Sequence, residues 1–158
     1  MKLYFLRHTD AIPAERPDLD DERPLSPKGH KQAASIAEFL SEIDVKFDTV
    51  FTSPLLRAKE TAQCVVAVTN DKTWVKTEIV EELRNETSQA DFSKWLRSLT
   101  DENHVLLVGH NPSISERVSH LLGVAHADAF SMPKGGLACL KTSDCKTASL
   151  EFFVSPKM

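Results

Sequence analysis

The sequence predicts an α/β fold: a three-layer α/β/α sandwich on a mostly parallel sheet with an antiparallel edge. Two observations predict it. Short apolar runs typical of strands alternate with longer segments of helical periodicity, as in sheets whose parallel strands are joined by helices. Near the end, residues 135–142 and 147–154 are two alternating apolar and polar runs joined through residues 143–146. They predict a hairpin, which supplies the antiparallel edge.

The chain begins with a predicted strand followed by a helix. Residues 3–6 (LYFL) are a short apolar run of strand type, and residues 24–43 have helical periodicity. Ser26 and Pro27 are expected at the N-cap and first position of this helix. We expect the acidic stretch at residues 18–22 to be a loop within the domain. The apolar face of the helix is expected to contain Ala33, Ile36, Ala37 and Leu40.

The same unit then repeats. Residues 48–53 predict a strand and residues 53–68 a helix, with Ser53 and Pro54 as a second N-cap signal. The apolar face of that helix is expected to contain Ala58, Ala62, Val65 and Val66. A cap at Asn111–Pro112 and a stop at Gly123 bound the last helix. The remaining predicted elements are a strand at 73–80, a helix at 90–99, a buried strand at 104–109 and a helix at 111–122.

Composition limits the classes of function. The 158 residues, 41% hydrophobic and 27% charged, fit one domain spanning residues 1–158 with an ample core. A net charge of −4 without a long run of Lys or Arg argues against binding to nucleic acid or to an anionic membrane. We expect a monomer.

Cysteine usage and the start of the chain indicate a cytoplasmic protein. Cys64, Cys139 and Cys145 form neither a CxxC pair nor an even set, so a disulfide or zinc framework lacks support. The first apolar run stops at Arg7 and His8, too early for the core of a signal peptide or for a membrane span.

Four cationic or potentially cationic side chains are expected at one edge of the sheet. Arg7 and His8 end the first strand, and His110 follows the buried strand at 104–109 through a glycine. Arg57 lies in the first turn of the second helix. Ligands of such sheets bind beyond the carboxyl ends of the strands, and helix N-termini favour anions. The pattern therefore predicts a site for a phosphate dianion, although an Arg-His pair is also common on ordinary surfaces.

Four motifs in order resemble the histidine phosphatases. They are LRHTDA at the first strand, RPLSPKG at residues 23–29, TSPLLRAKET at residues 52–61 and VGHNP at residues 108–112. The sequences of these motifs are most similar to those of the SixA-type phosphohistidine phosphatases, a compact branch of that family. The resemblance implies a phosphoglycerate mutase-like sandwich and a phosphatase that works through a phosphohistidine intermediate and requires no cofactor or metal.

The resemblance also implies roles for individual residues. His8 would be the nucleophile, and Arg7, Arg57 and His110 would hold the phosphate oxygens. Arg23 is expected to contact substrate or, as an equal alternative, to be a solvated loop residue. Thr9 and Asn111 are expected substrate contacts. A metal site at His8 and His110 lacks a supporting carboxylate. The histidines outside the motifs are His30, His104, His120 and His126, which we expect on surfaces or helices.

Two departures from the family pattern bear on substrate. Thr9 stands where the family usually has glycine, and no motif identifies a general acid. Glu82 is the leading candidate for that acid, and the alternatives are Glu81, Glu86 and Asp10. A site without a strong acid suits an imidazole leaving group better than an alkoxide. The expected substrate is therefore phosphohistidine on a protein; the alternatives are a small phosphate monoester and a catalytically silent phosphate-binding module.

Overall fold

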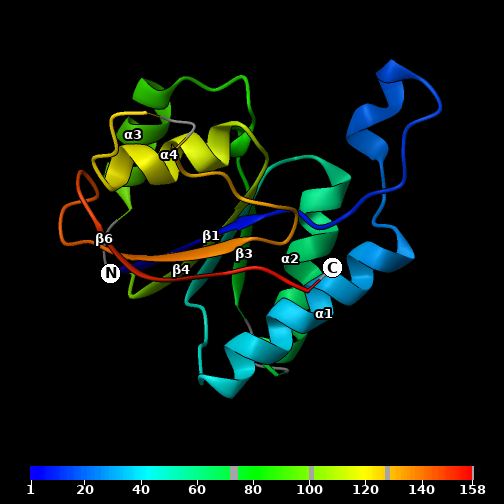
Figure 1. The fold of residues 1–158 in the computed structure, drawn as a ribbon, viewed down its shortest axis with the longest axis horizontal. Coiled ribbons are helices and arrows are strands. Elements are labelled where there is room, and N and C mark those ends of the chain that lie inside the picture. The colour runs from blue at the N-terminus through cyan, green and yellow to red at the C-terminus, as the bar shows by residue number, and fades with distance from the viewer. Residues whose placement is uncertain (72–74, 100–101, 127–128, 158) are drawn as a thin grey trace.

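The fold is built on one six-stranded sheet, as the computed structural model of the chain shows for residues 1–71, 75–99, 102–126 and 129–157 (Figure 1). The strand order is β3-β2-β4-β1-β5-β6. β1 and β2 both pair in parallel with β4, and β3 pairs in parallel with β2. β5 and β6 add the antiparallel edge, which confirms the predicted hairpin. The strands are β1 (Lys2–Arg7), β2 (Thr49–Thr52), β3 (Lys76–Ile79), β4 (His104–Gly109), β5 (Leu137–Lys141) and β6 (Ser149–Val154).

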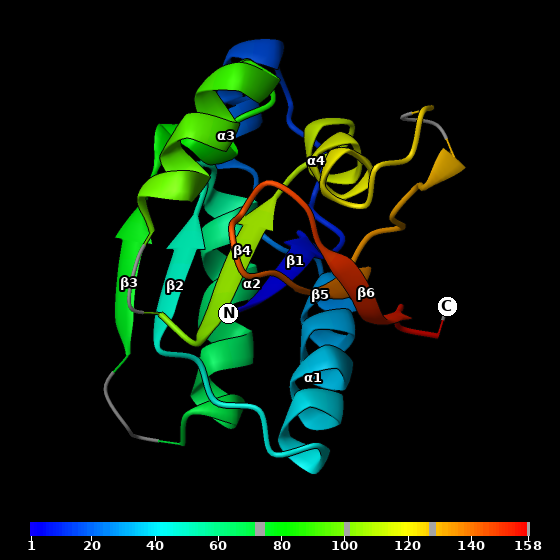
Figure 2. The same cartoon turned by 90° about the vertical axis from the view of Figure 1, so that its left-hand side faces the viewer.

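Helices cover both faces of the sheet, α1 and α2 on one side and α3 and α4 on the other (Figure 2). The sandwich predicted from the sequence is therefore confirmed. No helix in the described part of the chain combines the length and apolar character of a membrane span. The helices are α1 (Pro27–Glu42), α2 (Leu56–Thr69), α3 (Gln89–Ser98) and α4 (Ser113–Leu121), with short 3₁₀ helices η1 (Pro17–Glu22) and η2 (Glu81–Leu83).

The central strands are apolar throughout because each face packs against a helical layer. In β1, Tyr4 and Leu6 pack toward α1 and α2, whereas Leu3 and Phe5 pack toward α3 and α4. The predicted apolar faces of α1 and α2 are buried, except that Val66 is only partly covered. The two cores hold β1 and β4 rigidly, and these strands lead directly into the candidate site.

Helix starts differ from the prediction at two places. Ser26 does cap α1, because its hydroxyl accepts a hydrogen bond from the Gly29 N–H at 3.0 Å. Ser53–Pro54 does not cap α2, which begins at Leu56 without a side-chain cap. The Ser53 hydroxyl instead contacts the ring of His110. Asn111 does not cap α4 either, because its side chain bonds across the loop to Met132 and Ser115.

Two further boundaries were predicted incompletely. The acidic stretch at residues 18–22 is part of η1 rather than an irregular loop, since Pro17 starts a 3₁₀ turn that closes through Arg23. The third strand spans Lys76–Ile79, and residues 73 and 74 of its predicted range lie outside the described residues. Gly123 ends α4 with φ +70°, as its position predicted.

Gly29 generates a prediction for stability. The backbone of Asp10 passes so close to the first turn of α1 that a Cβ at position 29 would overlap the Asp10 carbonyl oxygen. We expect Gly29→Ala to lower the free energy of unfolding by about 1–3 kcal/mol, because backbone rather than a flexible side chain must move. Chemical denaturation measures the change. The control Ser35→Ala, on the exposed face of α1, should change it by less than about 0.5 kcal/mol; equal effects would contradict the prediction.

Candidate functional site

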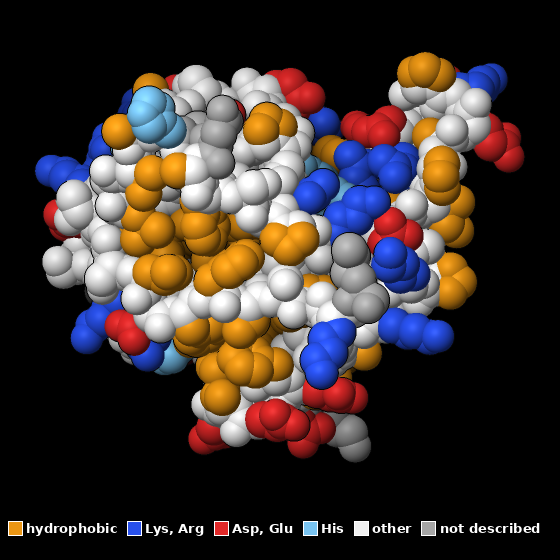
Figure 3. All heavy atoms as spheres, viewed as in Figure 1, with side chains coloured by type: hydrophobic (Ala, Val, Ile, Leu, Met, Phe, Trp, Pro, Cys, Tyr) orange, Lys and Arg blue, Asp and Glu red, His pale blue; other side chains and the backbone are white. Residues whose placement is uncertain are grey.

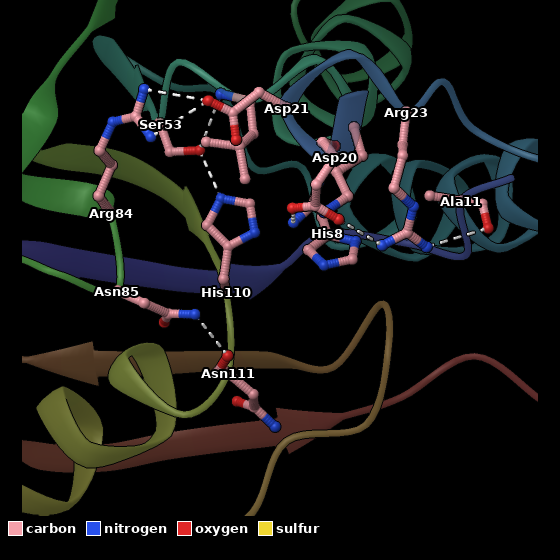
Figure 4. Close-up of polar contacts among 12 residues, drawn as sticks. His8, Ala11, Asp20, Asp21, Arg23, Ser53, Arg84, Asn85, His110 and Asn111 are labelled. Atoms are coloured by element: carbon pink, nitrogen blue, oxygen red, sulfur yellow. Dashed lines mark hydrogen bonds and ion pairs between the residues drawn. The ribbon is translucent and has the colours of Figure 1, made fainter. Parts of the chain in front are cut away.

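Strand pairing brings the two motif histidines together. β1 and β4 are parallel neighbours, with Arg7 opposite Gly109, so that the next residue of each chain segment is a histidine. The His8 N–H donates to the Gly109 carbonyl oxygen at 3.0 Å. The ring centroids of His8 and His110 lie 5.0 Å apart, and both side chains are more than nine-tenths buried (Figure 4). Two motifs that are about one hundred residues apart in sequence therefore form one site.

The two motif arginines complete the group from neighbouring elements. Arg7 ends β1, and its Nη1 donates to the Met132 carbonyl oxygen at 3.0 Å. Arg57 is the second residue of α2 and is 7% exposed. Figure 3 shows Lys and Arg side chains gathered around histidine atoms in a hollow. This hollow lies between the body of the molecule and a projecting arm, residues 11–23.

Buried nitrogens without partners mark this site. In the described part of the chain, four buried side-chain nitrogens have no hydrogen-bond partner, and three of them are Arg7 Nε, Arg57 Nε and His110 Nδ1. A buried donor left unpaired costs about 1–3 kcal/mol. Native proteins tolerate such groups mainly where a ligand satisfies them. The three atoms come from three separate elements, so their coincidence indicates a binding site for an anion with several acceptor oxygens.

The surroundings of His8 keep its ring neutral and leave one ring nitrogen with a free lone pair. Its Nδ1 lies 2.7 Å from the Thr9 carbonyl oxygen, which can only accept, so Nδ1 carries the proton and Nε2 keeps a lone pair. Burial lowers the pKa of His8 to about 4, and the charges of Arg57, Arg7 and Lys134 act in the same direction. The imidazole is therefore unprotonated at neutral pH, as a nitrogen nucleophile must be.

His110 is also neutral. Burial lowers its pKa to about 3, helped by the neighbouring His8 and Arg57. Its Nε2 lies 2.5 Å from the Ser53 hydroxyl oxygen, while Nδ1 is the unpartnered atom described above.

Thr9 and Asn111, two expected substrate contacts, bond within the protein. Thr9 is fully buried; its N–H donates to the Thr61 hydroxyl at 3.2 Å, and its own hydroxyl lies 3.3 Å from the same oxygen. The non-glycine residues with positive φ in the described chain are Asp44, Asp71 and Cys145, so Thr9 is accommodated without a left-handed backbone. Asn111 donates to the Met132 carbonyl oxygen and accepts from the Ser115 hydroxyl, which braces the loop after β4.

Arg23, expected either to contact substrate or to be a solvated loop residue, bonds to other residues of the arm. Its guanidinium donates to the carbonyl oxygens of Ile12 and Ala11 and to the Asp20 carboxylate, all within the arm (Figure 4). Asp20 in turn contacts Arg57 Nη2 at 3.2 Å through its carboxylate and Arg57 Nη1 at 2.8 Å through its carbonyl oxygen. Arg23 therefore shapes the arm that touches the site.

The structure separates the candidate acids. Glu82 and Glu81 line a cavity of about 480 Å³ against Trp95 on α3, whereas the small cavity beside His110, about 80 Å³, is lined by another set. Asp10 binds Lys134 at 2.7 Å and the Ser26 hydroxyl at 2.6 Å. Both contacts lower its pKa, so it is ionised at neutral pH. The cavity beside His110 is lined by Asp20, Asp21, Leu55, Arg57, Arg84, Asn85, Glu86 and His110.

Sequence reasoning missed several residues of the site. Arg84 lines the small cavity and reaches across it to Asp21 of the arm, with Nη1 3.4 Å from the carboxylate. No motif in the sequence marks that pair. Ser53 lies inside the TSPLLRAKET motif, but its cap-like context concealed the contact with His110.

The histidines outside the motifs lie elsewhere. His30, His120 and His126 are exposed, and His104 begins β4 at the opposite edge of the sheet. Within the described ranges, no three His, Cys, Asp or Glu side chains cluster as metal ligands.

Comparison with known proteins agrees with this geometry. The model of the histidine phosphatase superfamily (branch 1) matches residues 3–88. An uncharacterized protein of Picosynechococcus is 30% identical over 146 residues, covering 90% of this chain and 86% of that protein. Phosphohistidine phosphatase SixA of Escherichia coli is 30% identical over 123 residues, 77% of this chain and 74% of its own. A solved structure of the protein histidine phosphatase SixA complexed with tungstate superimposes with a TM-score of 0.85 at 25% identity, covering 99% and 97% of the two chains.

The depressed pKa values generate a prediction for stability against pH. Both imidazoles are protonated more readily in the unfolded chain than in the folded one. Their contribution to the free energy of unfolding is therefore complete above about pH 6.5 and is lost as pH falls toward 4. Each histidine should lower the free energy of unfolding by about 2 kcal/mol between pH 6.5 and pH 5. Denaturant unfolding at the two pH values should show a smaller loss for His110→Gln than for the parent. The control His120→Gln, on an exposed residue, should match the parent; a parent-like loss in His110→Gln would contradict the assignment.

Proposed function

The chain belongs to the histidine phosphatase superfamily, and from this premise we propose that it removes phosphate from phosphohistidine on a protein through an intermediate at His8. One observation supports the proposal above the others: buried nitrogens of Arg7, Arg57 and His110 have no partner, in the same site as a neutral imidazole whose lone pair is free. A tetrahedral phosphoryl group supplies oxygen acceptors that such nitrogens can donate to. The SixA structure that superimposes on this chain is itself a complex with a tetrahedral oxyanion, tungstate.

The chemistry proceeds in two displacements. His8 Nε2 attacks phosphorus, the Nε2–P bond forms, and the bond from phosphorus to the leaving nitrogen breaks; that nitrogen keeps the electron pair, and because the other nitrogen of the substrate ring carries a proton, the group departs as neutral imidazole. Water then attacks phosphorus, the Nε2–P bond breaks, and the proton of water leaves with the phosphate or to solvent. Arg7, Arg57 and His110 donate to the phosphoryl oxygens in both steps, where positioning and charge stabilisation supply most of the catalysis.

The acids near the site favour an imidazole leaving group. Asp10 is ionised, as described above. Partial burial of Asp20 opposes ionisation, but Arg57 and Arg23 outweigh it and lower the pKa of Asp20. Neither carboxyl therefore holds a proton at neutral pH for an alkoxide, whose conjugate acid has a pKa near 15. An imidazole, with a pKa of about 6.5, leaves without such help.

A small phosphate monoester is the second candidate substrate, and Glu86 is the observation that favours it. Glu86 lines the cavity beside His110, so an acidic residue borders the candidate site. A catalytically silent phosphate-binding module is a third possibility, because the same donors would bind phosphate without turnover. Trapping of a phosphoryl group on His8 separates an enzyme from a binding module.

The first activity prediction concerns the nucleophile. We expect His8→Ala to lower turnover of a phosphohistidine protein by roughly a thousandfold or more, because no other lone pair replaces Nε2. Rapid acid-free quenching with radiolabelled substrate should trap acid-labile phosphate on the parent and none on the variant. The exposed-site control His120→Ala should behave as the parent, and a chelator should leave the parent's activity unchanged. Turnover by His8→Ala near the parental rate would exclude His8 as nucleophile.

The second activity prediction concerns the leaving group. For phosphoryl substrates whose leaving groups rise in pKa, kcat/KM should fall steeply in the parent, because no acid protonates the departing atom. Glu86→Gln should follow a parallel line, as should the matched control Glu82→Gln, whose carboxyl lines the separate cavity. A flat series in the parent that becomes steep only in Glu86→Gln would identify Glu86 as a general acid. That result would replace phosphohistidine by a small phosphate ester as the proposed substrate.

A further inference from the structure

Ser53 is a fully buried serine with an unusual pair of contacts. It follows the last residue of β2 and precedes α2, yet it caps nothing. Its hydroxyl oxygen accepts a hydrogen bond from the Leu55 N–H at 3.4 Å and lies 2.5 Å from His110 Nε2 (Figure 4). The shorter contact joins the serine to a ring that the phosphate chemistry needs.

The positions of the protons follow from these contacts. The backbone N–H of Leu55 can only donate, so the Ser53 oxygen acts as its acceptor. The Ser53 hydroxyl proton then needs an acceptor of its own, because buried hydroxyls seldom remain unpaired. His110 Nε2 is the acceptor within hydrogen-bond distance among the described residues. A neutral ring whose Nε2 accepts carries its proton on Nδ1, and the low pKa of His110 keeps the ring neutral.

We propose that Ser53 is a positioning residue that holds His110 in the tautomer with its proton on Nδ1, so that His110 donates to the phosphoryl group. The inference rests on the proposed function, since it assigns a role within the same site. In this tautomer the unpartnered Nδ1 is a donor, and Figure 4 shows that nitrogen directed away from Ser53, toward the side of His8 and Asp20. In the other tautomer, Nδ1 would present a lone pair to an anion, which repels it.

The two histidines are thereby fixed in the same tautomer for opposite purposes. The Thr9 carbonyl oxygen holds the proton of His8 on Nδ1, which leaves Nε2 free to attack. The Ser53 hydroxyl occupies Nε2 of His110, which leaves the Nδ1 proton free to donate. The carbonyl acceptor beside His8 thus leaves that ring free to act as a nucleophile. The hydroxyl donor beside His110 leaves the second ring free to donate a hydrogen bond to an oxyanion.

The test compares variants that remove the hydroxyl with variants that keep it. Ser53→Thr and Ser53→Val have nearly the same shape, and one retains a hydroxyl where the other has a methyl group. Any disturbance of packing is therefore common to both. Ser113→Ala is the control: Ser113 is also buried, and its hydroxyl bonds the His110 carbonyl oxygen at 3.1 Å rather than the ring.

Two measurements that need no turnover decide the outcome. In protein labelled with ¹⁵N-histidine, the imidazole shifts of His110 at pH 7 should report a proton on Nδ1 in the parent, Ser53→Thr and Ser113→Ala, and on Nε2 in Ser53→Ala and Ser53→Val. Inorganic phosphate should bind on the order of tenfold more weakly to the last two, because one donor has become an acceptor. In a separate turnover assay, the inhibition constant of vanadate should rise by a similar factor in the same two variants.

Several results would overturn the inference. They are an Nδ1 proton retained in Ser53→Val, unchanged phosphate affinity after the tautomer has shifted, and an equal loss of affinity in Ser53→Thr and Ser53→Val. A parent that binds phosphate but hydrolyses no phosphohistidine would contradict the proposed function and leave the tautomer result standing. The two hypotheses therefore fail separately.

Discussion

The register between β1 and β4 is the constraint on which the site depends. Pairing of Arg7 with Gly109 sets His8 and His110 side by side immediately beyond the sheet edge. A shift by one residue would turn one of the rings toward a helical layer, because side chains alternate between the two faces of a strand. The apolar cores on both faces prevent such a shift, since Leu3 and Phe5 pack into one and Tyr4 and Leu6 into the other. The hydrophobic pattern of the strands therefore determines the geometry of the polar site.

The arginines gathered at that edge repel one another unless nearby carboxylates offset their charge. The arm provides two such carboxylates, because Asp20 contacts Arg57 and Asp21 contacts Arg84. Both come from a 3₁₀ helix that has no buried residue. Arg117 supports the opposite wall of the small cavity. Its buried guanidinium lies 4.3 Å from the Phe92 ring centre and donates to the Arg84 carbonyl oxygen at 3.0 Å. The cavity is thus bounded by one wall fixed in the core and one held mainly by ion pairs.

The fold and the gathering of four side chains at one sheet edge could be predicted from the sequence for a common reason. The four are Arg7, His8, Arg57 and His110. In a parallel sheet, every strand ends at the same edge, so a residue that ends a strand or opens the next helix is placed by the pattern alone. Loop contacts have no such periodicity. Nothing in the sequence indicates that Asp21 meets Arg84, or that η2 directs Glu82 to one cavity while Glu86 lines another. Ser53 was misassigned because serine before a helix is usually a cap, and only the neighbouring strand shows that an imidazole lies within its reach.

The division of work between arginine and histidine follows from their acid-base chemistry. Arg7 and Arg57 remain charged when buried, so they can neutralise a phosphoryl group without exchanging protons. Burial, with the charge of Arg57 at both rings and that of Arg7 at His8, holds the pKa of His8 and His110 near 4 and 3. Each imidazole is therefore kept neutral mainly by burial, and a neutral ring has one lone pair and one N–H. What distinguishes the two rings is the neighbour of each, a carbonyl oxygen at His8 and a hydroxyl at His110. In the proposed mechanism, these contacts, rather than the identity of the charged residues, decide which ring attacks phosphorus and which only binds its oxygens.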